Sequence, residues 1–532
     1  MSPALLSASS VDAPDVEYSL LAPMLIVFGV AAAGVLVEAF VPRRYRYGCH
    51  LVLGLGGLVA AFVAVVALAG TEESAVAGAV AIDGPTLFLQ GTILLVSILA
   101  IALIAERRID RVGTGDSDTG RGVVGRADAF APQASAVPGS VAELEATRAG
   151  VAQTEVFPLT LFAVGGMLLF PASNDLLTMF VALEVFSLPL YLLCGLARRR
   201  RLLSQEAAIK YFLLGAFSSA FFLFGTALLY GYSGTVSLPG IADAIASDAG
   251  ERPLALMGAA LLSVGLLFKV GAVPFHSWIP DVYQGSPTPI TAFMASATKV
   301  AAFGAMLRVF YVALPGLQTD WRPVLAAVAV LTMLVASVLA VTQTDVKRML
   351  AYSSVSHVGF ILTGLIAGSH DGISSTLFYL LAYSFSALGG FAVVGLVRGP
   401  DGEATTLSQW AGLGRRSPLL GSVFALLLLA YAGIPLTSGF VAKFAVFQAA
   451  LAGGALPLVL VGVLASAIAA FFYVRVIVLM FFAEPHADES VVAAPSVGTT
   501  VAIAVAAAVT VVLGIAPQPV LDLADSAASF LR

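Results

Sequence analysis

Long apolar runs separated by short polar connections extend along almost the whole chain. A transmembrane helix needs about 20 largely apolar residues, so each run of that length predicts one membrane crossing. Continuous runs exclude the alternating pattern of a membrane β-barrel. We therefore expect an all-α integral membrane protein with about fourteen transmembrane helices. The predicted spans are residues 18–40, 49–70, 83–105, 156–171, 174–197, 205–232, 253–282, 287–313, 322–342, 346–368, 372–398, 417–450, 456–484 and 498–516.

Two of these runs, 253–282 and 417–450, are longer than one bilayer crossing and contain Pro274 and Pro435 respectively. Proline removes a helical hydrogen bond and clashes with the preceding turn, so both runs predict broken helices. The breaks resemble each other, since residues 273–277 read VPFHS and residues 434–438 read IPLTS. A second match, in the same order, relates the sixth and eleventh spans.

These matches predict two five-helix repeats, 156–313 and 322–484, each with a proline-broken helix. Units with an odd number of crossings must lie in the membrane with opposite orientations, which is the inverted-repeat architecture of many transporters. The remaining segments are an N-terminal three-helix segment, 1–105, a polar insert, 106–155, and a C-terminal helix and tail, 485–532.

Composition supports a membrane location, since 59% of the 532 residues are hydrophobic and 11% are charged. Soluble domains carry about 25% charged residues. Asp12, Asp15 and Glu17 precede the first run where a cleavable signal peptide would be basic, so we expect a retained helix. The two cysteines, Cys49 and Cys194, have no metal-ligand spacing and are interpreted as packing residues.

The arginines predict the orientation. They gather after the first, third and fifth spans, including residues 43–46, the insert and residues 198–201. By the positive-inside rule these connections are cytoplasmic, which places both termini outside. The insert 106–155 is rich in Gly, Asp, Arg and Ser, and we expect it to be flexible or partly disordered. A tolerated insertion and a docking or regulatory segment remain alternatives.

All five lysines fall within or at the edge of a predicted span: Lys210, Lys269, Lys299, Lys347 and Lys443. A charged side chain at mid-bilayer costs at least about 2.5 to 3.5 kcal/mol, so chance is a poor explanation for this placement. A desolvated lysine can release its proton, whereas a guanidinium remains protonated. The pattern predicts a proton relay, with a static set of ion pairs as the alternative.

Depth in the membrane separates the lysines. Lys269 and Lys299 are predicted near mid-bilayer, where Glu184 of the fifth span is the natural counter-charge. Lys210 and Lys347 lie near cytoplasmic helix starts, where extension of the side chain to the headgroups is the alternative to a relay.

The first break adds further candidates. Pro274 is expected to free carbonyls near Lys269. His276 titrates near neutrality and can pass a proton on, although a structural histidine is an equal alternative. Asp281 is interpreted as a cap or loop anchor. Lys443 follows the second break by eight residues beyond Pro435.

Residues 274–289 read PFHSWIPDVYQGSPTP and residues 297–303 read ATKVAAF. These segments closely resemble subunit N, an antiporter-like, proton-pumping membrane subunit of bacterial respiratory NADH:quinone oxidoreductase (complex I). Residues 183–185, 347–354 and 433–444 match as well, and the resemblance covers about residues 156–484. The sister subunits typically lack the DVYQG form and have no lysine at position 299, which favours subunit N.

The resemblance implies that Glu184 and Lys269 form a coupled input pair, that Lys299 and Lys347 connect the relay, and that Lys443 is the terminal site nearest the outside. It implies proton translocation in the bacterial plasma membrane without redox chemistry in this chain. NADH, flavin, iron–sulfur clusters and quinone are expected in partner subunits, and neither a metal ion nor nucleic acid is expected as a ligand.

The expected partners are other membrane subunits of complex I, lipid and, indirectly, quinone. Two further functions remain open on the residues alone. One is a cation/proton antiporter, working by itself or as a subunit of an antiporter complex, and the other is a membrane scaffold in which the lysines form fixed ion pairs.

Overall fold

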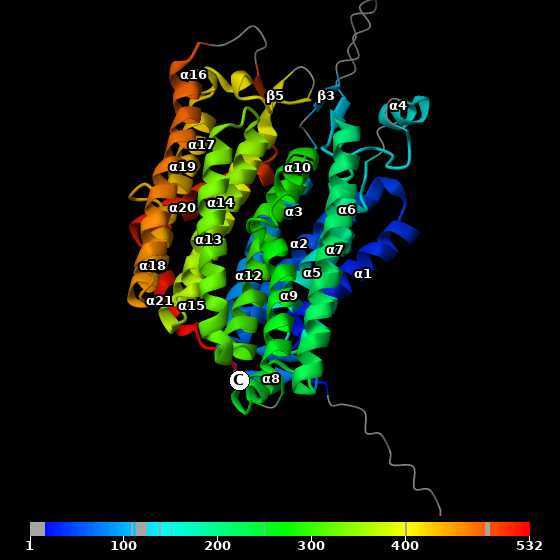
Figure 1. Ribbon diagram of the computed structural model, residues 1–532. Coiled ribbons are helices and arrows are strands. Elements are labelled where there is room, and N and C mark those ends of the chain that lie inside the picture. The colour runs from blue at the N-terminus through cyan, green and yellow to red at the C-terminus, as the bar shows by residue number, and fades with distance from the viewer. Residues whose placement is uncertain are drawn as a thin grey trace, which may run out of the picture.

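The computed structural model describes residues 16–107, 110–112, 125–137, 140–149, 152–248, 250–399, 402–484 and 490–531. It is a bundle of roughly parallel and antiparallel helices, with short strands and small helices at its two ends (Figure 1). The helices are α1 (Ala22–Phe40), α2 (Arg43–Ala67), α3 (Gly84–Ile104), α4 (Val141–Arg148), α5 (Val156–Ala172), α6 (Leu176–Cys194), α7 (Arg201–Ser233), α8 (Leu238–Ala246), α9 (Arg252–Val270), α10 (Trp278–Gly285), α11 (Thr288–Phe293), α12 (Lys299–Arg308), α13 (Gln318–Val341), α14 (Val346–Ile366), α15 (His370–Leu396), α16 (Leu413–Arg416), α17 (Pro418–Ala432), α18 (Ser438–Ala452), α19 (Leu456–Phe482), α20 (Val497–Ile515) and α21 (Gln518–Ser526).

Shorter elements complete the chain. They are the π-helical segments η1 (Met294–Thr298) and η2 (Val309–Ala313), the 3₁₀ segments η3 (Pro315–Leu317) and η4 (Leu407–Trp410), and the strands β1 (Glu73–Ala75), β2 (Val80–Ile82), β3 (Asp110–Val112), β4 (Gly125–Ala127), β5 (Val397–Gly399), β6 (Gly402–Glu403) and β7 (Val491–Val492). The strands pair antiparallel, as β1–β2, β3–β4 and β6–β5–β7, and the β5–β7 pairing joins Val397 to the distant Val492.

The predicted fold class is confirmed. Within the described residues, 12 helices are long and apolar enough to cross a membrane, and α5, α17 and α18 are shorter apolar helices. Each of the predicted spans overlaps one of these helices. Several helices begin at a side chain that caps the first turn: Asp175 accepts from the Leu177 and Thr178 amides at 2.8 Å, and Asp345 accepts from the Arg348 amide at 2.9 Å. Such caps satisfy amides that have no partner inside the helix.

Both predicted breaks are present. α9 ends at Val270 and α10 begins at Trp278, while α17 ends at Ala432 and α18 begins at Ser438. A glycine with a positive φ of 81° terminates each first half, Gly271 after α9 and Gly433 after α17. The left-handed region is costly for residues with a Cβ atom, which explains glycine at both positions. The first halves of the two broken helices therefore end in the same way, and the inverted repeat itself stays a prediction.

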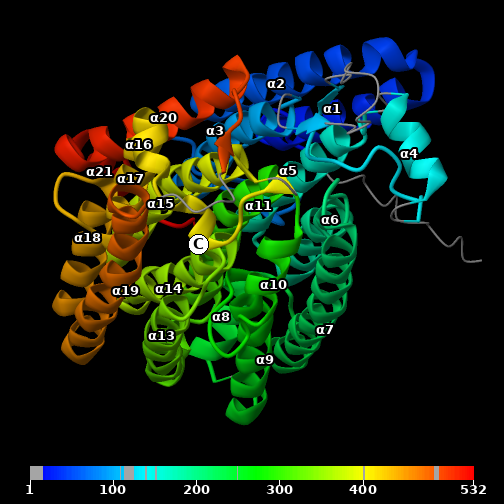
Figure 2. The same cartoon turned by 90° about the horizontal axis from the view of Figure 1, so that it is seen from above.

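The centre of the bundle is the continuous segment α11–η1–α12–η2 together with α14 and α15, which are almost wholly buried. Figure 2 shows α10, α11 and α14 between α7 at one end of the bundle and α19 at the other. The outer helices α1, α2, α7, α13 and α19 have large exposed apolar side chains, as helices that face lipid do.

A buried ion pair joins the N-terminal helices to the centre. Arg308 of α12 donates to Asp83, before α3, at 2.7 Å, and both side chains are fully buried. The same guanidinium donates to the Pro171 carbonyl at 2.7 Å, and Asp83 also accepts from the Leu531 amide at 3.0 Å. Arg308 therefore connects α3, α5 and the C-terminal residues, a role that the sequence analysis did not assign.

The insert is more ordered than expected in its described parts. It contains the β3–β4 hairpin and α4, and Phe130 is buried. Asp128 pairs with Arg198 at 2.7 Å, and Glu143 pairs with Arg201 at 2.7 Å. The expectation of flexibility also concerns residues 113–124, which lie outside the described residues. Arginines that were assigned to orientation alone thus also hold the insert against the bundle.

Candidate functional site

Four of the five lysines are buried: Lys269, Lys299, Lys347 and Lys443 are each no more than 5% exposed. The side chain of Lys210 is 41% exposed and pairs with Glu206 and Asp281, each at 2.7 Å. Extension to the membrane surface therefore does not describe Lys347. The structure separates Lys210, at the edge of the bundle, from the four lysines inside it.

Lys269, near the end of α9, points to α6. Its Nζ donates to Ser187 Oγ at 2.8 Å and to the Tyr191 hydroxyl at 3.4 Å. Glu184 lies one turn before Ser187 on the same helix, and its buried Oε1 has no hydrogen-bond partner among the described residues. The Glu184 charge acts on Lys269 through space, and neutral hydroxyls make the direct bonds to the ammonium.

Lys299 is the first residue of α12, directly after the π-helical segment η1. Its Nζ donates to the Ser354 carbonyl of α14 at 2.7 Å. A π-helical segment inside a transmembrane helix often marks a functional position, because it displaces backbone carbonyls and re-aims the following side chains. The sequence predicted the burial of Lys299 but not the irregular turn before it.

Helix α14 connects these groups. Lys347, Ser354 and His357 follow one another along one side of it, and the helical rise separates Lys347 from Ser354 by about 10 Å and from His357 by about 15 Å. His357 Nδ1 lies 2.7 Å from the Tyr379 hydroxyl, and its buried Nε2 has no hydrogen-bond partner among the described residues. The sequence analysis missed His357, whose partner Tyr379 lies on the next helix, α15.

Lys443 of α18 occupies the second break. Its Nζ donates to the Tyr431 carbonyl at 2.9 Å, to the Ala432 carbonyl at 3.0 Å and to Ser466 Oγ at 2.9 Å. The two carbonyls end α17, where the break leaves them without helical partners. Lys443 thus uses carbonyls that the proline-containing break has freed.

At the first break, where Pro274 is expected to free carbonyls near Lys269, two carbonyls in the last turn of α9 have donors. The Gly271 and Ala272 amides close the end of α9 on the Leu267 carbonyl, each at 2.9 Å. The Phe268 carbonyl accepts from Trp278 Nε1 at 3.0 Å. The expectation stays a prediction for the Lys269 and Val270 carbonyls, and the Lys269 side chain itself donates to hydroxyls of α6.

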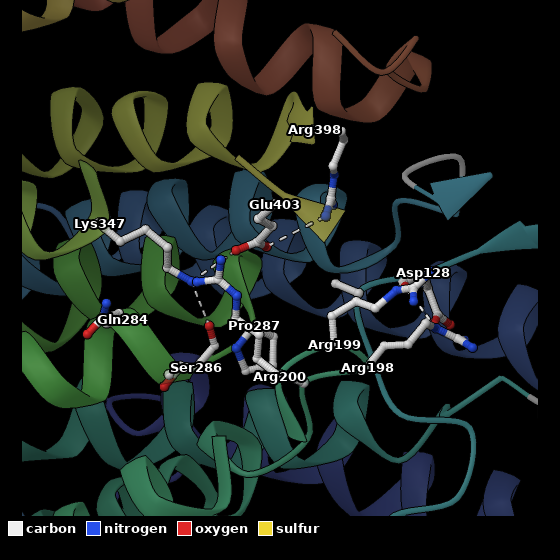
Figure 3. Close-up of a pocket in the computed structure, with 13 residues that line it drawn as sticks. Asp128, Arg198, Arg199, Arg200, Gln284, Ser286, Pro287, Lys347, Arg398 and Glu403 are labelled. Atoms are coloured by element: carbon white, nitrogen blue, oxygen red, sulfur yellow. Dashed lines mark hydrogen bonds and ion pairs between the residues drawn. The ribbon is translucent and has the colours of Figure 1, made fainter. Parts of the chain in front are cut away.

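Lys347 lies at the end of the bundle that also carries β5 and β6. Its Nζ donates to the Ser286 carbonyl at 2.8 Å and to Glu403 Oε2 at 3.2 Å (Figure 3). It also donates to Thr288 Oγ1 at 3.0 Å. Arg398 lies 3.9 Å from the other oxygen of Glu403. Burial opposes ionisation of Glu403, but Lys347 and Arg398 outweigh burial and hold the pKa of its carboxyl below the ordinary value.

His276 and Asp281 lie just beyond the first break. His276 is half-buried, and its buried Nδ1 has no hydrogen-bond partner among the described residues. Asp281 pairs with Lys210 of α7 and, at 2.6 Å, with Arg348 of α14. These ion pairs hold α10 between its neighbours, which agrees with the anchoring role expected for Asp281.

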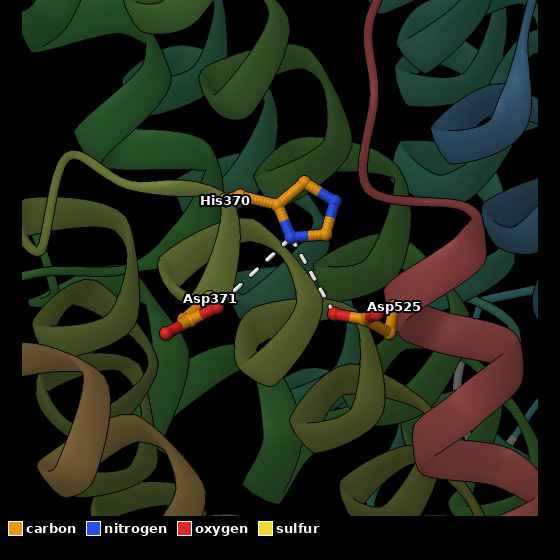
Figure 4. A group of neighbouring side chains, drawn as sticks. All are labelled: His370, Asp371 and Asp525. Carbon is orange, nitrogen blue, oxygen red and sulfur yellow. Dashed lines mark ion pairs between the residues drawn. The ribbon is translucent and has the colours of Figure 1, made fainter.

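Among the described residues, one group has the side chains of a metal site, namely His370, Asp371 and Asp525. His370 Nδ1 lies 3.4 Å from Asp525 and 4.0 Å from Asp371, and all three are exposed (Figure 4). These contacts connect the start of α15 to α21, and surface ion pairs of this kind stabilise a fold only slightly.

A multi-helix membrane bundle with ionisable side chains buried along its interior is the architecture of an ion-translocating membrane subunit. The family model described as "NADH:quinone oxidoreductase/Mrp antiporter, TM" matches residues 173–469. The chain is 75% identical to NADH-quinone oxidoreductase subunit N of Rhodococcus opacus, with 99% of each chain covered, and 66% identical to subunit N of Mycobacterium tuberculosis, with 98% of this chain and 99% of the relative covered. The chain belongs to this family, within its subunit N group, which confirms the family predicted from residues 274–289.

Two solved structures bear on the choice between a complex I subunit and a subunit of a cation/proton antiporter complex. A chain of respiratory complex I from Thermus thermophilus with bound aureothin is similar with a TM-score of 0.75 and 31% identity, covering 94% of this chain and 99% of that one. A chain of the Mrp complex from Dietzia sp. has a TM-score of 0.78 but 22% identity, covering 96% of this chain and 97% of that one. The second likeness shows the fold alone, so the antiporter-complex alternative is the weaker one.

Proposed function

We infer that this chain translocates protons as an antiporter-like membrane subunit of a bacterial NADH-quinone oxidoreductase, through a relay of its buried lysines. The observation that carries the residue-level proposal is the bonding of the lysines. Lys269, Lys299 and Lys443 are buried and donate to neutral oxygens of hydroxyls and carbonyls. A cation bound by neutral acceptors loses no ion-pair partner when it deprotonates, which suits exchange of a proton better than a salt bridge does.

The proposed order follows the helices. Glu184 and Lys269 form the input pair on α6 and α9, Lys299 passes the proton along α14, and Lys443 is the final group on the outer side. His357 shares ring neighbours with both lysines, since it contacts Tyr383, which lies next to Lys299, and Phe360, which lies next to Lys443. Lys347 joins the relay at its cytoplasmic end, while Lys210 and His276 lie beside it, at the α7–α10 side of the first break.

The same architecture supports the proposed domains. The units 156–313 and 322–484 each contain one broken helix, the segment 1–105 packs α3 against the centre, and the C-terminal segment 485–532 packs α20 against α15 and α3. The arginine-rich connections, the described part of the insert and β5 lie at one end of the bundle, and α8 and the C-terminus lie at the other (Figure 1). This separation favours a cytoplasmic insert and outward termini.

As a subunit of complex I, the chain has other subunits of that complex as its partners. We propose that NADH oxidation and quinone reduction, with their flavin and iron–sulfur clusters, take place in those partners, and that quinone acts on this chain only indirectly. Lipid covers the outer apolar helices such as α7, α13 and α19.

Replacement of Lys299 by Gln tests the relay, because Gln keeps a polar side chain but cannot carry the proton. We expect NADH-driven proton uptake into inverted membrane vesicles to fall strongly, while co-purification of the variant chain with the NADH-oxidising complex confirms assembly. Arg252→Gln is the matched control, since it removes an exposed cation paired with Asp320 at 2.8 Å. Normal pumping in assembled Lys299→Gln would refute the proposal.

A further inference from the structure

We propose that Glu403 and the polar cavity beside it form the cytoplasmic proton entrance to Lys347. This inference rests on the proposed relay and deepens it by adding a residue and a path. Glu403 belongs to β6, in the connection between α15 and α17, and lies outside the membrane-spanning helices. It has no counterpart among the residues that the sequence analysis selected.

The contact between the two groups is direct. Glu403 Oε2 lies 3.2 Å from Lys347 Nζ, which is a hydrogen-bond distance for transfer of a proton. Thr288 Oγ1 bridges them, since it accepts from Lys347 and donates to Glu403 Oε1 at 2.5 Å. Lys347 is 1% exposed as a residue, whereas the Glu403 side chain retains 18% exposure. Glu403 is therefore the more exposed member of the pair and lies on the surface side of Lys347.

A cavity of about 30 Å³ extends from this pair toward the surface. Its lining passes from the exposed Arg199 and Arg200 to Gln284, Ser286 and the buried Lys347 (Figure 3). A water molecule in a polar cavity needs about 10 to 15 Å³ of such space, so the cavity holds about two. Two hydrogen-bonded waters are enough to connect the surface to Glu403.

The charges around Glu403 determine when its carboxylate takes up a proton. The groups that face it are Lys347 from α14, Arg398 from β5 and the Thr288 hydroxyl from α11. While Lys347 is protonated, these cations keep Glu403 ionised. When Lys347 passes its proton inward, one of the two cations is lost and burial favours the neutral acid, so Glu403 takes a proton from water.

The protonated Glu403 then transfers its proton to the neutral Lys347. The O–H bond at Glu403 breaks, an N–H bond forms at Lys347 Nζ, and the carboxylate and ammonium of the resting pair are restored. No charge other than the proton crosses the entrance. The arginines that line the cavity disfavour entrance of a metal cation, whereas a proton can pass along the waters without a cation entering.

Glu403→Gln tests the entrance, because the amide keeps the shape and hydrogen bonds but cannot carry the proton. We expect at least about ten-fold slower NADH-driven proton uptake in inverted vesicles, with assembly verified by co-purification of the variant chain with the NADH-oxidising complex. The double variant Glu403→Gln, Lys347→Gln should pump no more slowly than the single variant Lys347→Gln, since Glu403 acts only through that lysine. Glu143→Gln is the matched control, because Glu143 is a carboxylate at the same end that pairs with Arg201 outside the cavity.

Pumping by Glu403→Gln within two-fold of wild type, with Lys299→Gln still impaired, would overturn the entrance and leave the relay standing. Normal pumping by Lys299→Gln would instead refute the relay itself. If Glu403→Gln does not assemble, Glu403→Asp replaces it, because the shorter side chain keeps the charge but lengthens the transfer distance. Slower pumping in the assembled Asp variant supports the entrance, and a wild-type rate overturns it.

Discussion

Exchange of Lys443 for Arg separates a proton relay from a fixed cation. The ammonium uses its three donors on the Tyr431 and Ala432 carbonyls and on Ser466 Oγ, all within 3.0 Å. A guanidinium has five donors and can keep these acceptors while it retains the positive charge. A structural cation at the second break should therefore tolerate arginine, apart from some crowding against Gly433.

The size of the expected effect follows from the chemistry of the two cations. The ordinary pKa of a guanidinium exceeds that of a lysine ammonium by at least about 2 units, and by about 3 on the higher values for arginine. Each unit corresponds to about 1.4 kcal/mol, so release of a proton from arginine costs at least about 3 kcal/mol more. If Lys443 must become neutral in every cycle, its release step slows at least about 100-fold.

The assay is NADH-driven proton uptake in inverted vesicles, normalised to assembled complex. Lys443→Arg should pump as poorly as Lys443→Ala, whereas Arg415→Lys should pump normally. Arg415 is the matched control, because it bonds the Phe481 and Phe482 carbonyls at an exposed helix end. Near-normal pumping in Lys443→Arg would refute the relay role and return Lys443 to a structural one.

Two further predictions concern orientation and stability. Single cysteines at the exposed Ser135 and Ser247 should react with an impermeant thiol reagent from opposite sides of the membrane, and reaction from the same side would contradict the proposed topology. Arg308→Met should destabilise the subunit by about 3 to 5 kcal/mol, because it leaves Asp83 charged and buried, whereas Arg252→Gln should cost less than about 1 kcal/mol. Thermal unfolding of the detergent-solubilised complex measures both variants, and equal losses would contradict this account of the buried pair.

The helices and breaks could be predicted because the membrane imposes a simple rule on the chain. Apolar length gives the crossings, and Pro274 and Pro435 give the breaks, without any knowledge of packing. The burial of Lys269, Lys299 and Lys443 followed in the same way. The exact ends of the broken helices could not be predicted, since Gly271 and Gly433, rather than the prolines, terminate α9 and α17.

Glu403 and His357 could not be found with the same rule. Glu403 lies in a connection, where an acidic residue is ordinarily solvated, and only the packing of β5 and β6 over α14 brings it to Lys347. His357 lies in an apolar helix, but its use depends on Tyr379 of α15, which is 22 residues away in sequence. Both roles depend on contacts between elements, which a periodic pattern does not encode.

The two breaks have similar sequences but different chemistry, and the direction of helical side chains explains why. Side chains in a helix tilt toward its N-terminus. Lys269 is near the C-terminal end of α9, so its side chain tilts away from the break and reaches Ser187. Lys443 is in the second turn of α18, so its side chain tilts back to the break and reaches the carbonyls of α17. Two breaks of similar sequence therefore bind their lysines differently. A lysine before the break bonds side chains of a neighbouring helix, and a lysine after the break bonds the carbonyls that end the first half.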